Sequence, residues 1–118
     1  MIIQEIVLKK GEADWVYLAE VASLVQRDRS EGDERTVMER TLHLVRELAE
    51  AWLVVIGDLS GPDGKFSPWQ LSVTDTVERI RREWMALGRP INVGDVCWLS
   101  NTLDGDKRAV SLPDISLD

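Results

Sequence analysis

The sequence predicts a small α+β domain, and three observations carry this prediction. A helical pattern of apolar residues over 34–51 leads directly into the apolar run 53–56, whose β-branched residues favour a strand. Two further helical patterns lie on either side of that pair, at 15–26 and 73–87. The 118 residues are enough for one hydrophobic core without a metal or a disulfide. We therefore expect three helices packed on a small mixed or antiparallel sheet, in the order β-α-α-β-α-β(-β).

The first third of the chain is expected to form a strand, a turn and a helix. Residues 2–8 are aliphatic and largely β-branched, which favours a strand, and the glycine within 10–12 favours a turn. Asp14 is a candidate N-cap for the helix over 15–26. The mixed-charge segment 27–34 is expected to be an exposed loop. The apolar face of this first helix consists of Trp15, Leu18, Ala19, Ala22 and Val25.

A long amphipathic helix is predicted from Glu34 to Ala51. Its core face consists of Met38, Leu42, Val45, Ala49 and Trp52. The run from Leu53 to Ile56 shows no alternation of apolar and polar residues, so we expect this strand to be covered on both faces.

The third helix, over 73–87, has the clearest boundaries. Ser72 and Asp75 have the spacing of a capping box at its start, and Gly88 and Pro90 are stop signals just past its end. The residues before it, 60–64 and 65–69, are expected to be loops.

The C-terminal part is expected to complete the sheet. The run Val96–Leu99 favours a buried strand, and 104–106, with two aspartates around a glycine, favours a hairpin turn that returns residues 109–112 beside it. We expect one domain over residues 1–112 and a frayed tail over 113–118.

The segment from Trp15 to Leu59 resembles the middle of winged-helix domains in its order of elements. This resemblance implies a recognition helix over 36–51 and a first wing strand over 53–59. Two features differ from the family: a complete helix lies between residues 58 and 96, and the helix over 34–50 has three arginines against four glutamates, or −1. Such a face is more typical of a protein-docking module, and an unrelated mixed-sheet fold is the alternative.

The charge and the cysteine content restrict the class of protein. With 21 acidic and 14 basic residues, the net charge is −7, which opposes binding to duplex nucleic acid and is compatible with a basic protein partner. One cysteine forms no internal disulfide, and the N-terminal apolar run is too short for a signal peptide or a membrane span. These features predict a cytoplasmic protein that does not insert into a membrane.

No catalytic set is evident, and we predict no enzyme activity, metal or cofactor. His43 lies four residues from both Glu39 and Glu47, a spacing that can hold a divalent cation but is also common on a solvated helix face. Cys97 lies in an apolar run, which favours a buried structural thiol.

Five tryptophans stand beside one tyrosine and one phenylalanine. Trp15, Trp52, Trp84 and Trp98 occupy expected core positions. Trp69 is in a predicted loop three residues from Phe66, where it either plugs the edge of the core or forms a contact surface; its size favours the plug.

We therefore expect a non-enzymatic protein-binding domain, either an immunity- or antitoxin-type protein or an adaptor, that docks onto a basic partner. Its candidate interaction residues are Phe66, Trp69, Arg79 and Arg82. One alternative is a winged-helix DNA-binding regulator that places Arg35, Arg40 and Arg46 on phosphates. The other is a small metal-dependent enzyme built on the His43 cluster. The oligomeric state is open.

Overall fold

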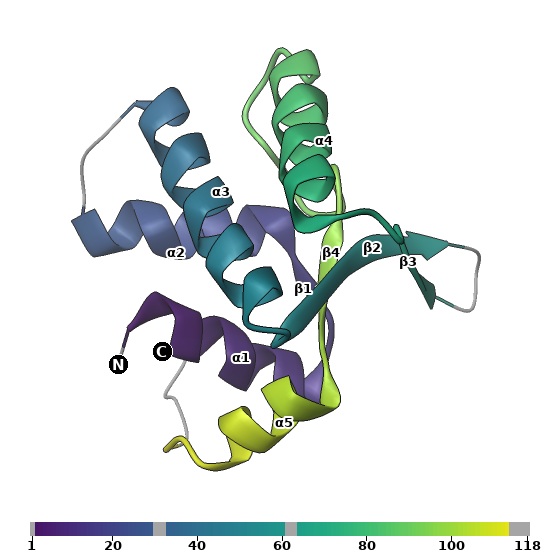
Figure 1. Cartoon of the computed structure of the whole chain (residues 1–118). Helices are drawn as coiled ribbons and strands as arrows, with labels where there is room; N and C mark the ends of the chain where they lie inside the picture. The colour runs from purple at the N-terminus through teal and green to yellow at the C-terminus, as the bar shows by residue number, and fades with distance from the viewer. Residues whose placement is uncertain (1, 30–32, 61–63, 114–118) are drawn as a thin grey trace.

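The computed structural model describes residues 2–29, 33–60 and 64–113, and within these ranges the chain forms five helices and a four-stranded sheet (Figure 1). This confirms the predicted α+β class, with five helices in the described residues where three were predicted. The elements are α1 (Ile3–Ala13), β1 (Val16–Tyr17), α2 (Leu18–Arg29), α3 (Glu34–Glu50), β2 (Val54–Ser60), β3 (Lys65–Pro68), α4 (Val73–Ala86), β4 (Trp98–Asn101) and α5 (Leu103–Val110).

The sheet is antiparallel, with the strand order β1-β4-β2-β3. Leu99 of β4 lies opposite Val16 of β1 on one side and Ile56 of β2 on the other. The hairpin formed by β2 and β3 extends away from the helices (Figure 1). Residues 65–69, predicted to be a loop, therefore contribute a strand instead, because residues 65–68 pair with β2.

The predicted second helix and the strand after it are confirmed as α3 and β2. The prediction that Trp52 belongs to the core face of this helix is wrong, because Trp52 lies past the end of α3 and is 74% exposed. The Asp33 side chain caps α3 by accepting a hydrogen bond from the Thr36 amide, at 2.9 Å, and this bond lowers the pKa of Asp33. At the other end, the Trp52 amide donates to the Ala49 carbonyl and the Leu53 amide to the Leu48 carbonyl. These two bonds form a Schellman cap, from which β2 leaves directly.

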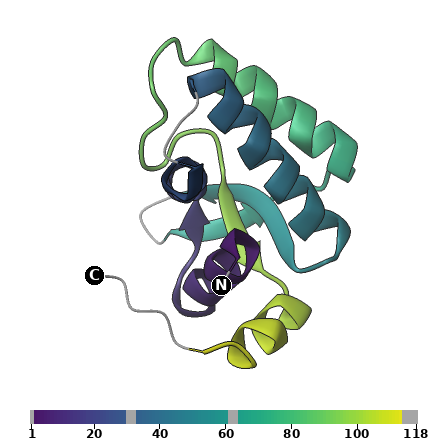
Figure 2. The same ribbon diagram turned by 90° about the vertical axis from the view of Figure 1, so that its left-hand side faces the viewer.

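Helix α4 is also as predicted, and it packs alongside α3 (Figure 2). The Ser72 hydroxyl accepts a hydrogen bond from the Asp75 amide at 3.0 Å, and Gly88 follows the helix with a φ of 65°. Val77, Ile80 and Trp84 bury its inner face.

The predicted N-terminal strand is wrong, because residues 3–13 form α1. The apolar pairs at 2–3 and 6–7 are separated by Gln4 and Glu5, a spacing that repeats every four residues and suits a helix. Val7 and Leu8 are buried on its inner face. Asp14 ends α1 instead of capping the next helix, and α2 begins at Leu18 because residues 16 and 17 pair with β4.

The predicted C-terminal hairpin is also wrong, because residues 103–110 form α5. The Thr102 hydroxyl caps this helix by accepting from the Gly105 amide at 2.9 Å. Gly105 packs so close to the Leu53 carbonyl that a Cβ at this position would overlap the carbonyl oxygen. The glycine is therefore needed for this close contact and does not form the predicted turn. Strand β4 begins at Trp98, two residues later than predicted, after Val96 adopts a φ of 70°. Of the predicted frayed tail, residues 114–118 lie outside the described residues.

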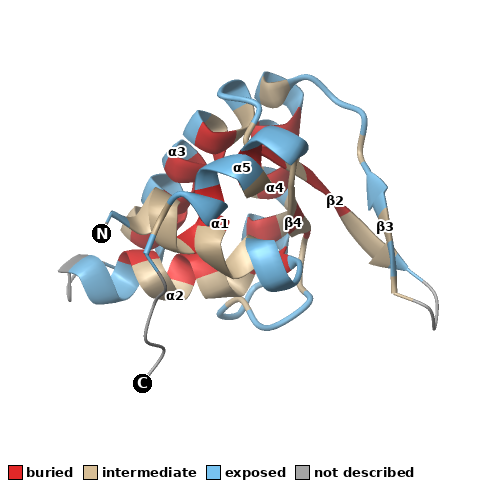
Figure 3. Cartoon of the chain, turned by 90° about the horizontal axis from the view of Figure 1, so that it is seen from below, coloured by how far each residue is buried: buried red, intermediate tan, exposed pale blue. Residues whose placement is uncertain are grey.

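The core lies between the helices and one face of the sheet, where the buried positions gather (Figure 3). Val16, Ile56 and Leu99 are at most 5% exposed on this face. Val55, on the other face of β2, is only partly buried, so the prediction that the strand is covered on both sides is wrong for that face. None of the described helices has the length and apolar character needed to cross a membrane.

Candidate protein-interaction site

The outer face of the sheet carries aromatic side chains. Tyr17 lies opposite Trp98, and Trp98 lies opposite Gly57 of β2. Phe66 lies opposite Leu59, which is two residues from Gly57 and therefore on the same face. Tyr17, Trp98 and Phe66 are all partly exposed, in contrast to the buried residues of the inner face.

Two ring contacts join these side chains to each other and to Trp15. The rings of Trp15 and Phe66 stack with centroids 6.4 Å apart and planes inclined by 14°. The rings of Tyr17 and Trp98 meet edge to face, with centroids 5.7 Å apart. A Cβ at Gly57 would overlap the backbone of Ser67, so the glycine allows the backbone of β3 to approach β2 closely at this point. We call Trp15, Tyr17, Phe66 and Trp98 the aromatic face; it holds four of the seven aromatic residues of the chain.

A groove of about 590 Å³ runs along β1 at the edge of the aromatic face. Trp15, Tyr17 and Trp98 line it, together with charged side chains from α1 and α2. A smaller hollow of about 260 Å³ shares Trp15 with this groove and extends to Asp106 of α5. Both volumes are open to solvent and accessible to another molecule.

The charges around the groove are mainly negative. Among the described residues that line the groove and the hollow, the carboxylates of Glu12, Asp14, Glu20 and Asp106 outnumber the ammonium groups of Lys9 and Lys10, for a net charge of 2 − 4 = −2. Both lysines form ion pairs within the site, Lys9 with Glu12 at 3.2 Å and Lys10 with Glu20 at 3.3 Å. Aromatic rings beside carboxylates favour ammonium and guanidinium groups as ligands.

Of the four predicted interaction residues, only Phe66 belongs to the aromatic face. Trp69 packs against the core, in agreement with its predicted role as a plug. The guanidinium carbon of Arg79 lies 3.8 Å from the centre of the Trp69 ring, and Arg79 also bonds Glu83. Arg82 is exposed on α4. The structure therefore does not gather these four residues into one site.

Trp15 and Trp98 are the residues that the sequence reasoning missed, because both were assigned to the core. Trp15 is 38% exposed, and Trp98 is partly exposed on the outer face of β4. The alternation of Trp15, Val16 and Tyr17, with the valine buried between two aromatic residues, is the signal of a strand that would have placed Trp15 and Tyr17 on its outer face; it does not bear on Trp98.

The arginines proposed for DNA contact do not form one basic stripe on α3. At about 100° per residue, Arg35 and Arg46 lie on one side of the exposed face and Arg40 lies about 120° away or more. Glu39, Glu47 and Glu50 occupy the intervening surface. Arg46 pairs with Glu50 at 3.4 Å, and Arg81 of α4 bonds Glu39.

The proposed metal cluster is not assembled either. His43 Nε2 lies 3.2 Å from a Glu47 carboxylate oxygen, but Glu39 is engaged by Arg81. In the part of the chain that the structure describes, no three histidine, cysteine or acidic side chains are placed to hold a metal ion. Cys97 is 1% exposed, and burial, with smaller contributions from Asp58 and Glu83, raises the pKa of its thiol.

A second groove, of about 540 Å³, lies between α2, the start of α3 and the end of α4. Trp84 contributes to its wall, and the indole N–H of Trp84 has no acceptor among the described residues. Its charged lining is balanced, with Lys10 and Arg27 against Glu20 and Glu34, so its charge indicates no particular ligand.

Comparison of the chain with protein-family models, with curated proteins and with solved structures gives no significant match. The functional argument therefore depends on the geometry and charge of the aromatic face.

Proposed function

We propose that this chain is a non-enzymatic binding domain that docks onto a basic segment of a protein partner through the aromatic face. One observation supports the proposal above all others: four aromatic side chains lie on a partly exposed sheet face, beside a groove and a hollow whose linings together carry a net charge of −2. Exposed tryptophan and tyrosine are the residues most often found at the energetic centre of protein interfaces.

The proposed recognition uses lysine or arginine side chains of the partner. A guanidinium above the ring of Trp15 or Trp98 gains about 0.5–2 kcal/mol from the cation–π contact, depending on how far it is desolvated. The carboxylate of Asp14, which is exposed and lines the groove, can add a charge-assisted hydrogen bond. The net charge of −7 attracts a basic partner over a longer range and speeds the encounter.

This mode of binding suits two biological roles. An immunity- or antitoxin-type protein covers the basic surface of a toxin, and an adaptor holds a basic segment of one protein near another. Both roles are consistent with the cytoplasmic location that we propose from the single cysteine.

A peptide-display selection tests the proposal. We expect the purified domain, at about 0.15 M salt where distant charges are screened, to enrich peptides rich in lysine or arginine. Trp15→Ala should abolish the enrichment although it leaves the net charge unchanged. Asp14→Asn should weaken binding more than Asp28→Asn, which removes an equal charge from the far end of α2.

The proposal fails under either of two results. One is a selection that enriches acidic or uncharged peptides. The other is binding that Trp15→Ala and the two asparagine variants reduce equally, because non-specific attraction to a negatively charged protein would then explain it.

A further inference from the structure

The groove along β1 adjoins the second groove, which lies beside α2. We call them the β1 groove and the α2 groove. Four residues line both of them: Lys10, Tyr17, Glu20 and Val93. Lys10 and Glu20 form an ion pair at 3.3 Å, and their side chains are only 17% and 27% exposed. The junction of the two grooves therefore carries little net charge.

An exposed apolar side chain stands at this junction. Val93, in the segment between α4 and β4, is 65% exposed and lines both grooves. Leu24 and Ile91 add apolar surface to the α2 groove, and both are only partly buried. An apolar segment lying across the junction would remove this surface from water, which stabilises a complex.

The α2 groove also offers a hydrogen-bond donor. Trp84 is 4% exposed and lines this groove, and its indole N–H has no acceptor among the described residues. A buried donor that stays unpaired is unfavourable, so a carbonyl oxygen from a bound segment would be stabilised there. The charged lining of the groove is balanced, with two basic against two acidic side chains. Uncharged residues with free backbone carbonyls therefore suit the α2 groove.

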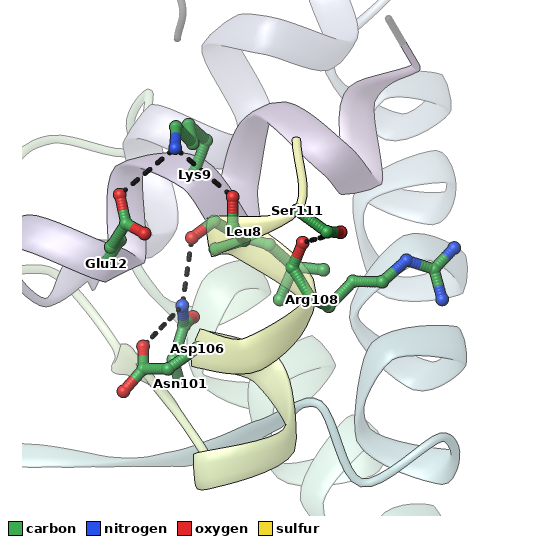
Figure 4. Close-up of polar contacts among 8 residues, drawn as sticks. Leu8, Lys9, Glu12, Asn101, Asp106, Arg108 and Ser111 are labelled. Carbon is green, nitrogen blue, oxygen red and sulfur yellow. Dashed lines mark hydrogen bonds and ion pairs between the residues drawn. The ribbon is translucent and has the colours of Figure 1, made fainter. Parts of the chain in front are cut away.

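The α1 wall of the β1 groove is held in place by contacts with other elements (Figure 4). Lys9, which lines this groove, pairs with Glu12 at 3.2 Å and donates to the Ala109 carbonyl of α5 at 3.2 Å. The Asn101 side chain of β4 donates to the Leu8 carbonyl at 2.9 Å. A wall that is already ordered lowers the entropy cost of binding a segment beside it.

From these observations we propose that the partner contributes one extended segment that lies in both grooves. Its basic residues occupy the β1 groove, and its uncharged, apolar residues occupy the α2 groove, where one of their carbonyls accepts from the Trp84 indole. This inference rests on the proposed function, because it extends the same site.

The length of the two grooves sets the length of the segment. From Asp14 to Tyr17 an extended chain spans about 10 Å, and this stretch lines the β1 groove. From Ala19 to Arg27, which line the α2 groove, the distance along the axis of α2 is about 12 Å. An extended segment that follows both therefore has at least about seven residues.

Isothermal titration calorimetry with capped synthetic peptides tests the length and the order of the segment. The probes are a lysine triplet, the same triplet with a leucine-alanine-leucine-alanine stretch either before or after it, and the triplet followed by four serines. We expect one of the two leucine–alanine peptides to bind at least about tenfold tighter than the triplet and the serine peptide. Both chain directions are included because the segment can enter the grooves from either end.

Filling the α2 groove separates the two halves of the site. Ser23 is partly exposed on α2 and lines the α2 groove but not the β1 groove. Ser23→Trp should remove the gain of the longer peptide and leave the binding of the triplet unchanged, and Ser23→Ala should keep both. In a ¹⁵N NMR spectrum the indole signal of Trp84 should shift when the longer peptide binds, whereas that of Trp52, past the far end of α3, should not.

The outcomes distinguish this inference from the proposed function. Longer peptides that bind no tighter than the triplet overturn the inference alone, and so does a gain that Ser23→Trp leaves intact or a Trp84 signal that stays in place when the longer peptide is bound. If none of the peptides binds, the proposed function fails as well.

Discussion

The guanidinium carbon of Arg79 lies 3.8 Å from the centre of the Trp69 ring. Trp69 follows β3, and its amide donates to the Ile56 carbonyl of β2 at 3.1 Å, whereas Arg79 lies in the second turn of α4. The Arg79 side chain is held from its other side by Glu83, at 2.6 Å. This contact therefore joins the β2–β3 hairpin to α4. The guanidinium of Arg79 is engaged by Trp69 and Glu83 within the molecule.

Replacement of Arg79 by glutamine should destabilise the domain. The variant loses the cation–π contact and the ion pair with Glu83, and we expect the free energy of unfolding to fall by about 1–2 kcal/mol. Urea denaturation followed by tryptophan fluorescence measures this change. Arg82→Gln, three residues along the same helix, should change it by less than about 0.5 kcal/mol, and equal effects of the two variants would contradict the assignment.

Replacement of Trp52, whose φ is 60°, by glycine should stabilise the domain. A non-glycine residue in the left-handed region costs about 1–2 kcal/mol, and Trp52 recovers little of this through burial. We therefore expect Trp52→Gly to be more stable than Trp52→Ala by about 1 kcal/mol, because alanine keeps the backbone cost. Thermal unfolding of dilute protein compares the two, and an alanine variant as stable as the glycine variant would exclude a backbone cost.

The sequence predicted the elements whose signals are local. Helices α3 and α4 were found because their apolar spacing is long and regular, and α4 also has Ser72 and Gly88 at its two ends. Strand β2 was found because a continuous, largely β-branched apolar run follows the predicted helix directly. The class of the fold followed from these three elements.

Helix α1 was missed although its four-residue apolar spacing is a local signal, but other missed features depend on contacts between distant segments. Gly105 has the appearance of a turn residue, but its role is set by the Leu53 carbonyl, about fifty residues earlier in the chain. Trp15 was assigned to the core because it fits the apolar face of a helix predicted over 15–26, whereas its partner, Phe66, lies on a strand that was not predicted. Tertiary contacts of this kind override local preference, and no single-sequence pattern contains them.

Replacement of Gly105 by alanine should destabilise α5 despite the higher helix propensity of alanine. The new Cβ overlaps the Leu53 carbonyl, which is backbone and cannot move without opening the start of β2. We expect a loss of about 1–3 kcal/mol in the free energy of unfolding, measured by urea denaturation. Lys107→Ala, at an exposed position of the same helix, is the control and should be nearly neutral.

The buried thiol of Cys97 should make the stability of the domain depend on pH above 9. Because its pKa is raised in the folded state from the ordinary value of 9.0, the unfolded chain loses this proton first as the pH rises. The free energy of unfolding should then fall by up to about 1.4 kcal/mol per pH unit, with no contribution from Cys97 below pH 9. Urea denaturation between pH 8 and about 10.5 measures the slope, and Cys97→Ala should have a smaller slope. Identical slopes would show that other groups cause the dependence.

Duplex DNA distinguishes the protein-binding proposal from its winged-helix alternative. A recognition helix that placed Arg35, Arg40 and Arg46 on phosphates would bind with a slope of about −3 in a plot of log affinity against log salt concentration. In this molecule Arg81 of α4 holds Glu39 in the middle of that face, and four glutamates against three arginines repel the phosphates. We therefore expect no binding by fluorescence anisotropy even at about 20 mM salt, where electrostatic attraction is strongest. Salt-sensitive binding that Arg40→Gln weakens would establish α3 as a DNA-contacting helix, since Arg40 has no carboxylate partner among the described residues to confuse the result.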